Sequence, residues 1–331
     1  MNIDHPKISY GKTGILLINL GTPDSTNWWD IRKYLKEFLS DKRVIEVNPF
    51  FWQIILNIFI LNLRPSKTAK AYKKIWMEDK NMSPLRFYTE MQSTKLSKEI
   101  SNKSILVNYA MRYGNPSIKS KIENMQKKGC EKLIIFPLYP QYASPTTATV
   151  CDEVFRVLMK MRWQPAIQVV PHYESEPLYI EALVNSINKK LSSIDWKPDL
   201  IVASYHGIPK KYFEKGDPYH CYCQKTTRLI SEKFNQIKII TTFQSRFGPE
   251  EWLQPYTDKT LEKLPKEGVK KVLLITPGFA SDCVETLEEI SIQGKESFEK
   301  AGGEKFELIP CLNDNDDHIS LLEHLVKRNL N

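Results

Sequence analysis

The sequence predicts an α/β fold of two similar halves, each a parallel sheet flanked by helices. Short β-branched or apolar runs, bounded by Gly, Pro or Asn, alternate with stretches of helical period, which is typical of parallel sheets. Eight such runs occur, enough for two sheets. Two segments of the first half also reappear, in the same order, in the second half.

The eight runs expected to form strands lie along the whole chain. In chain order they are 14–20, 105–110, 133–137, 167–170, 200–205, 237–243, 272–276 and 306–309. Short, nearly continuous apolar runs of this kind are typical of strands that are covered on both faces. We therefore expect helices on both faces of each sheet.

The internal repeat joins strands to the loops that follow them. ILVNYAMRYGNP (105–116) resembles IKIITTFQSRFGP (237–249), and GCEKLIIFPLYPQYAS (129–144) resembles GVKKVLLITPGFASDC (268–283). Arg112 and Arg246 fall at matching places just after a strand, where open α/β sheets present their ligand-binding loops.

The first half carries an insertion. About 90 residues separate its first strand from the partner strand, against 36 in the second half. The insertion covers about 27–90. We predict an N-terminal domain at 1–165, which includes this insertion, and a C-terminal domain at 166–331.

The insertion contains the most apolar stretch of the chain, FFWQIILNIFILNL at 50–63. Its 14 residues include three polar side chains, so it is too short and too polar to span a bilayer. One interpretation is a buried helix. The other is an exposed apolar lip that binds a flat hydrophobic ligand or a membrane surface, as the flanking bases Arg64, Lys67 and Lys70 permit. The sequence leaves both open.

Composition excludes several classes of protein. The 331 residues are 41% apolar and 26% charged, which excludes a disordered or collagen-like chain. Six sparse cysteines and a polar start predict a protein of the reducing cytoplasm. The net charge of +8 favours anionic partners, but the lysines are spread out and no nucleic-acid motif is present, so we expect no nucleic-acid partner.

His206 lies at the carboxyl end of a predicted strand, followed by Gly207 and Pro209, which start a turn. This position is typical of active sites, and a histidine there can exchange protons near neutral pH. A structural, hydrogen-bonded histidine fits the local sequence equally well.

A row of acidic residues follows the seventh predicted strand. Asp282 is placed to cap a helix, and it shares a helix face with Glu285 and Glu289 at spacings i, i+3 and i+7. Gln293 and Glu296 continue the row. From the residues alone a solvated charged face is favoured over a site for a cation.

The cysteines give a weaker signal. Cys221 and Cys223 are closer together than usual zinc pairs and no second pair follows, so we interpret them as structural. Cys283 lies in the acidic segment, where it is either a soft ligand for iron or a small buried side chain.

Further motifs follow one another along the whole chain: INLGTPDS, AYKKI with NMSPL, AMRYGNPSI, FPLYPQYAS, SYHGIP with GDPY, TTFQSRFGPEEWL and SDCVETLEEI. In sequence and in order they resemble the motifs of the ferrochelatases, the terminal enzymes of haem synthesis. The resemblance implies a chelatase fold of two Rossmann-like domains, with the active-site cleft between them. It also implies Fe²⁺ as a substrate and no tightly bound cofactor.

The resemblance assigns roles to individual residues. It makes His206 and Glu285 the catalytic pair and the metal-handling groups, facing each other across the porphyrin. Glu289 and Asp282 match an acidic path that leads away from the site. The residues that match porphyrin-binding positions are Arg112, Tyr113, Tyr72, Ser83 and Trp252. The arginine is suited to pair with a propionate.

The chemistry implied by the resemblance needs groups of these types. A porphyrin must lose two pyrrole protons while Fe²⁺ sheds water, and binding the ring bent exposes its nitrogen lone pairs. His206 would accept protons, while the carboxylates offer oxygen ligands or a proton path. Which side delivers metal and which removes protons stays open.

The sequence departs from some relatives. Animal members bind a 2Fe-2S cluster through a cysteine in the SPTT segment and three more in a tail, whereas Ser144 occupies that position here and no cysteine follows Cys311. We therefore predict no such cluster. Cys283 stands where animal enzymes have a second histidine, and Gln293 replaces a glutamate of some relatives.

We predict an enzyme that inserts Fe²⁺ into protoporphyrin IX. The alternatives are the same reaction on coproporphyrin III, whose four carboxylates need more polar partners, and an inactive tetrapyrrole-binding protein. The lip favours the more hydrophobic porphyrin. The resemblance further implies a cytoplasmic monomer, with residues 50–63 available to meet the inner face of the cytoplasmic membrane.

Overall fold

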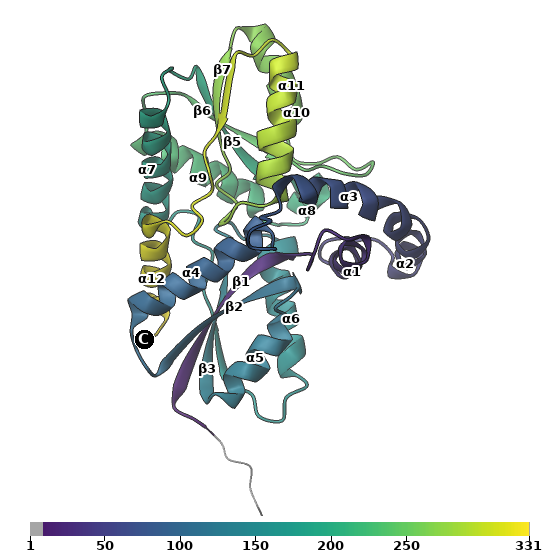
Figure 1. The fold of residues 1–331 in the computed structure, drawn as a ribbon, viewed down its shortest axis with the longest axis vertical. Coiled ribbons are helices and arrows are strands. Elements are labelled where there is room, and N and C mark those ends of the chain that lie inside the picture. The colour runs from purple at the N-terminus through teal and green to yellow at the C-terminus, as the bar shows by residue number, and fades with distance from the viewer. Residues whose placement is uncertain (1–8, 331) are drawn as a thin grey trace, which may run out of the picture.

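The computed structural model describes residues 9–330, which fold into two four-stranded sheets (Figure 1). Every strand pairs parallel to its neighbours. The first sheet has the order β2-β1-β3-β4 and the second the order β6-β5-β7-β8. The strands are β1 (Lys12–Thr22), β2 (Ile105–Gly114), β3 (Cys130–Pro137), β4 (Ala166–Val169), β5 (Leu200–His206), β6 (Ile239–Gln244), β7 (Lys271–Ile275) and β8 (Lys305–Leu308).

All eight predicted strands are therefore confirmed, and so is their division into two sheets. The two sheets have the same strand order: adding four to each strand number of the first sheet gives the order of the second. The internal repeat predicts this correspondence. One detail differs from the predicted domain limits. Strand β4 pairs with β3, so the first sheet continues past residue 165. The division into two domains otherwise stays a prediction.

The apolar runs form strands because both faces of each sheet are covered. In β1, Ile15 and Leu17 belong to one core cluster while Leu16 and Ile18 belong to another, and all four are fully buried. This alternation follows from the two-residue period of a strand. The strand carries apolar side chains on both faces, as buried parallel strands do.

Helices cover both sheets. Those outside the insertion are α4 (Pro84–Ile100), α5 (Ile118–Lys127), α6 (Thr149–Leu158), α7 (Pro177–Ser193), α8 (Lys210–Glu214), α9 (Tyr219–Lys233), α10 (Thr257–Lys263), α11 (Lys295–Lys300) and α12 (Asp316–Leu330). Shorter segments are the π-helices η2 (Ser144–Ala148) and η4 (Glu285–Gly294) and the 3-10 helix η3 (Leu264–Glu267).

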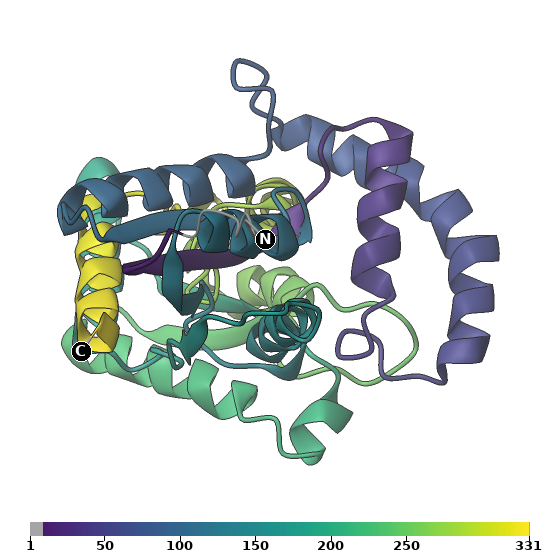
Figure 2. The same cartoon turned by 90° about the horizontal axis from the view of Figure 1, so that it is seen from below.

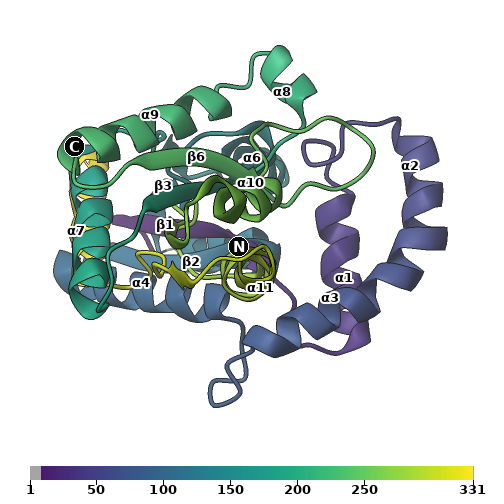
Figure 3. The ribbon, with the colours of Figure 1, turned by 90° about the horizontal axis from the view of Figure 1, so that it is seen from above.

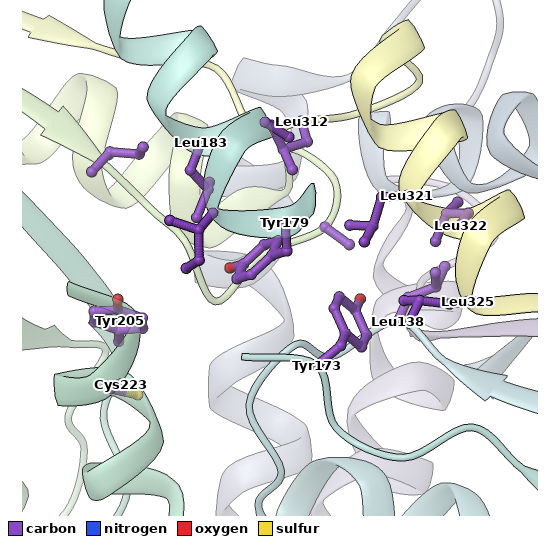
Figure 4. Close-up of a cluster of buried hydrophobic side chains, with 14 of the residues drawn as sticks. Leu138, Tyr173, Tyr179, Leu183, Tyr205, Cys223, Leu312, Leu321, Leu322 and Leu325 are labelled. Carbon is purple, nitrogen blue, oxygen red and sulfur yellow. The ribbon is translucent and has the colours of Figure 1, made fainter. Parts of the chain in front are cut away.

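One hydrophobic cluster joins the two halves. It brings together Leu138, which follows β3, Tyr205 of β5, Tyr179 of α7 and Leu325 of α12 (Figure 4). Helix α12 belongs to the end of the chain but packs on α4 and α7 and also contacts β3. The same cluster contains Ile15 of β1, so the core of the first half is completed by residues near the end of the chain.

The insertion forms a helical lip. It consists of α1 (Trp28–Leu39), α2 (Pro49–Ile55), the π-helix η1 (Leu56–Ile60) and α3 (Leu61–Ile75), and it projects to one side of the two sheets (Figures 2 and 3). Within 50–63 only Leu56 and Leu61 are buried. The exposed apolar side chains are Phe50, Phe51, Ile54, Ile55, Ile58, Phe59 and Leu63.

The exposure predicted for the lip is thus confirmed and the buried-helix interpretation is wrong, while binding of a ligand or a membrane by the lip stays a prediction. Leu63 and Phe50 are 75% and 72% exposed, which a core helix would not allow. Two buried leucines suffice to anchor the segment on the cluster that contains Ile31 and Tyr34 of α1. None of the helices within residues 9–330 combines the length and the apolar character that crossing a membrane requires.

Candidate functional site

A cavity of about 450 Å³ lies between the two halves. Much of its lining comes from the carboxyl ends of strands or the loops that follow them, among them Leu138 after β3, His206 at the end of β5 and Ser245 after β6. The lip contributes Arg64 and Lys67 from α3. Ligands of open α/β sheets bind at these strand ends, because the loops there converge on one edge.

His206 lines this cavity as the last residue of β5. Its Nδ1 lies 2.6 Å from the backbone oxygen of Gly207. A carbonyl oxygen only accepts hydrogen bonds, so Nδ1 carries the hydrogen and donates it. In the neutral ring the lone pair is then on Nε2, which is therefore the atom able to accept a proton or bind a metal.

Gly207 lets the chain turn tightly beside this histidine. Its N–H donates to the oxygen of Gln244 at 2.8 Å. A Cβ at this position would lie 2.9 Å from the same backbone oxygen and 3.2 Å from the Trp252 ring. Glycine is therefore required by close packing on the cavity wall.

The acidic segment forms the π-helix η4. It places four polar side chains along the cavity: Glu285, Glu288, Glu289 and Gln293. The α-helical spacing used in the sequence analysis selected three of these but missed Glu288. A π-helix hydrogen-bonds from i to i+5, so its wider turn changes which residues share a face.

Asp282 does not join this row. It precedes the helix, is 4% exposed, and is absent from the cavity lining. Its carboxylate accepts hydrogen bonds from Asn313 Nδ2 at 2.7 Å, Thr286 Oγ1 at 3.0 Å and the Cys311 N–H at 3.3 Å. These contacts tie η4 to the segment after β8, and none of them is the backbone N–H bond of a helix cap. The predicted cap and shared face are therefore corrected.

Glu289 is fixed by the loop after β6. Its carboxylate accepts the backbone N–H of Ser245 at 2.7 Å and also the Ser245 hydroxyl. Burial raises the pKa of Glu289, although the Ser245 hydrogen bond and the nearby His206 oppose the shift. Glu289 also lines a second cavity of about 490 Å³, so it contributes to the walls of both.

Three predicted porphyrin-binding residues have different surroundings. Trp252 lines the cavity and donates its indole N–H to the oxygen of Phe247 at 3.0 Å. Tyr72 is buried in the lip, where burial and the Glu285 carboxylate raise its pKa. Ser83 is buried and caps α4, with its hydroxyl accepting the Arg86 N–H at 3.3 Å. Only Trp252 of the three forms part of the cavity wall.

Arg112 and Tyr113 lie on β2, away from the cavity lining. The Arg112 guanidinium is paired with Asp41, donates through Nε to the oxygen of Thr149 at 2.8 Å, and lies 4.3 Å from the centre of the Tyr113 ring. The Tyr113 hydroxyl donates to the same Asp41 carboxylate at 3.0 Å. Both expected ligand groups are thus engaged by a carboxylate of the protein itself.

The sequence predicts a different role for Arg64 and Lys67, as bases that flank a membrane-binding segment. The structure places both on the cavity wall. Neither makes an ion pair with any residue in the described part of the chain. Their i, i+3 spacing on one helix, just before the AYKKI motif, is the signal that would have identified them.

Cys283 and the GDPY motif were also singled out by the sequence. Cys283 lines the cavity, and burial raises the pKa of its thiol, which favours the neutral form over a metal-binding thiolate. In GDPY, the Asp217 carboxylate accepts the backbone N–H of Ser144 at 2.7 Å and of Tyr219 at 3.0 Å. That motif therefore joins the loop after β3 to the start of α9.

Comparisons with known proteins agree with this arrangement. The family model described as Ferrochelatase matches residues 12–330. A ferrochelatase of Allorhizobium ampelinum is 58% identical over 330 residues, covering 99% of this chain and 96% of the relative. A ferrochelatase of Rhizobium meliloti is 57% identical over 332 residues, covering 99% and 98%.

Two solved structures have a similar fold. SirB from Bacillus subtilis with Fe3+ has a TM-score of 0.57 at 13% identity, covering 96% of this chain and 95% of SirB. CbiX, described as the terminal enzyme of sirohaem biosynthesis in denitrifying bacteria, has a TM-score of 0.53 at 10% identity, covering 96% and 100%. These likenesses establish the two-halved chelatase fold, while the match along the full sequence establishes that the chain belongs to the ferrochelatase family and is a metal chelatase.

Proposed function

We propose that this ferrochelatase inserts Fe²⁺ into protoporphyrin IX, with His206 and Glu285 as its catalytic residues. The observation that carries the proposal is a single cavity lined by an imidazole with a free Nε2 and by the carboxylates of η4. A porphyrin must exchange two protons for a divalent cation, and these are the two kinds of group that the exchange needs.

His206 Nε2 accepts pyrrole protons in this proposal. Its Nδ1 is held by Gly207, so the ring is oriented and its tautomer is fixed before the substrate arrives. Glu285 and Glu289 offer oxygen atoms to Fe²⁺ or take up the released protons. The raised pKa of Glu289 makes this carboxyl easier to protonate, which favours a proton-relay role over permanent metal binding.

Two cations at the cavity wall support a dicarboxylate substrate. Arg64 and Lys67 are free to pair with the propionates that protoporphyrin IX carries. The neighbouring lip is apolar, which suits the vinyl and methyl groups of this ring. Coproporphyrin III, with four carboxylates, remains the alternative substrate, and a tetrapyrrole-binding protein without activity remains the alternative function.

An anaerobic assay with Fe²⁺ separates these possibilities. Purified protein is given protoporphyrin IX and coproporphyrin III in parallel, and the loss of free-base fluorescence is followed. Faster consumption of protoporphyrin IX is the expected result. A preference for coproporphyrin III would overturn the substrate, and tight binding of either ring without metallation would overturn catalysis.

We further propose that no 2Fe-2S cluster of the animal type is present. Ser144 occupies the position of a cluster cysteine, and its hydroxyl accepts a hydrogen bond from Arg43 at 3.3 Å. Iron analysis and the visible absorption spectrum of the purified protein test this statement. Sedimentation of the same sample tests the proposed monomer.

We also propose that the lip docks on the cytoplasmic membrane from the cytoplasmic side. Its exposed phenylalanines and isoleucines form an apolar surface, with Lys70 nearby to meet anionic lipid headgroups. In a flotation experiment with vesicles that contain anionic lipid, the wild type should rise with the vesicles. The triple variant Phe50→Ser, Phe51→Ser and Phe59→Ser should stay behind. Equal flotation of both proteins would overturn the proposal.

A further inference from the structure

Glu288 is a buried carboxylate on the cavity wall with a partner from the lip. It is 5% exposed and lies on η4 between the two acidic residues assigned above. Lys74 of α3 reaches across and places its Nζ 2.9 Å from Glu288 Oε1. Gln293 Nε2 donates to both carboxylate oxygens, at 2.9 and 2.7 Å. Lys74 and Gln293 thus occupy both oxygen atoms of the Glu288 carboxylate.

The other two carboxylates of the row have no such cation. Within residues 9–330, no lysine or arginine lies within ion-pair distance of Glu285 or Glu289. Three carboxylates therefore line one cavity, but only Glu288 is neutralised. The hydrogen bond to this carboxylate also raises the pKa of Lys74.

We propose that Lys74 keeps Glu288 out of iron coordination and thereby sets how tightly the cavity holds Fe²⁺. This inference rests on the proposed function, in which Glu285 and Glu289 meet the incoming metal. Lys74 is a positioning residue, because it acts through Glu288 and does not touch the metal itself.

The physical argument concerns release of the metal. A chelatase must hand its metal to the porphyrin, so a site that binds Fe²⁺ too strongly slows the transfer. Adding a third carboxylate to a divalent cation increases the attraction at short range in a partly buried site. A buried carboxylate that loses its cation is costly until another positive charge replaces it. Without Lys74, Glu288 is a third carboxylate on this wall that is open to Fe²⁺.

The test compares three variants. Lys74→Met removes the charge and keeps most of the chain length, while Lys73→Met removes the same charge from a neighbouring exposed residue. The double variant Lys74→Met with Glu288→Gln removes the charge and the carboxylate together. Anaerobic calorimetric titration of each porphyrin-free protein with Fe²⁺ gives the dissociation constants, and steady-state assays give kcat and the KM for Fe²⁺.

We expect Lys74→Met to bind Fe²⁺ about tenfold more tightly than wild type, with a lower KM and a lower kcat. Lys73→Met should match wild type, and the double variant should recover the wild-type dissociation constant. Unchanged Fe²⁺ binding in Lys74→Met, or failure of the double variant to reverse the change, would overturn the inference. A lip that is merely misplaced would alter porphyrin affinity and would not be rescued by Glu288→Gln. If the wild type binds Fe²⁺ but inserts none, the proposed function fails while the titration still tests Lys74.

Discussion

Replacing Asp41 by Asn should destabilise the protein by about 3 kcal/mol, because it leaves the Arg112 guanidinium charged and buried. The pair is 6% and 11% exposed, so water cannot take over the role of the lost carboxylate. Breaking a buried pair by removing one partner typically costs about 3 to 5 kcal/mol. We take the lower limit because the amide oxygen of Asn can still accept one hydrogen bond.

Asp152→Asn is a matched control for this prediction. Asp152 also pairs with an arginine, at 3.1 Å from Arg43 Nη2, but both side chains are 40% exposed. Exposed pairs contribute about 1 kcal/mol or less, so the control should unfold close to the wild type. Urea unfolding followed by circular dichroism measures both variants. Equal losses in the two variants would refute the reasoning that burial makes the Arg112 pair important.

The same variant tests the role in porphyrin binding that the resemblance to ferrochelatases implies for Arg112. Asp41 occupies the guanidinium that a propionate would need. If the arginine does bind a propionate, removing its internal partner should tighten porphyrin binding, measured by fluorescence quenching in the absence of metal. Weaker or unchanged binding would leave Arg112 with a structural role.

Three further predictions concern the cavity. His206→Ala should lower the rate of iron insertion by at least about a hundredfold while protoporphyrin still quenches protein fluorescence, and normal turnover would remove the imidazole from the mechanism. Glu285→Gln should fold normally and lose at least about nine-tenths of its turnover, since the carboxylate is replaced by a neutral group, whereas a wild-type rate would reduce it to a surface charge. The raised pKa of Glu289 means that the folded state binds its proton more tightly than the unfolded state does. The stabilisation of the folded state by protonated Glu289 is therefore present below the ordinary carboxyl pKa of 4.5 and is lost as pH rises through the folded pKa. Glu289→Gln should remove this part of the pH dependence of the free energy of unfolding, measured by urea unfolding. An identical pH profile in the variant and the wild type would contradict the prediction.

The strands were predictable because their signal is local. A parallel strand covered on both faces needs a short run of apolar residues, and all eight runs became strands within a few residues of the expected ends. The position of His206 followed from the same reasoning, since a residue at the end of a buried strand is carried to the edge of the sheet.

The side chains that meet across elements were harder to predict. The α-helical period placed Asp282 in the acidic row and omitted Glu288, because nothing local indicates that the helix widens into a π-helix. The Asp41 contact with Arg112 joins residues 71 positions apart, which no spacing rule detects. The sequence could not decide between a buried helix and an exposed lip at 50–63, because an apolar segment looks the same in sequence whether protein, ligand or membrane covers it.

The packing of α12 has a consequence for synthesis on the ribosome. Leu321, Leu322 and Leu325 lie in the same core cluster as Ile15 of β1, so the first sheet cannot complete its core until residues 316–330 have emerged. During translation the first half therefore presents an uncovered apolar face for as long as the remaining sequence takes to be made. Such nascent chains are open to aggregation and to capture by chaperones.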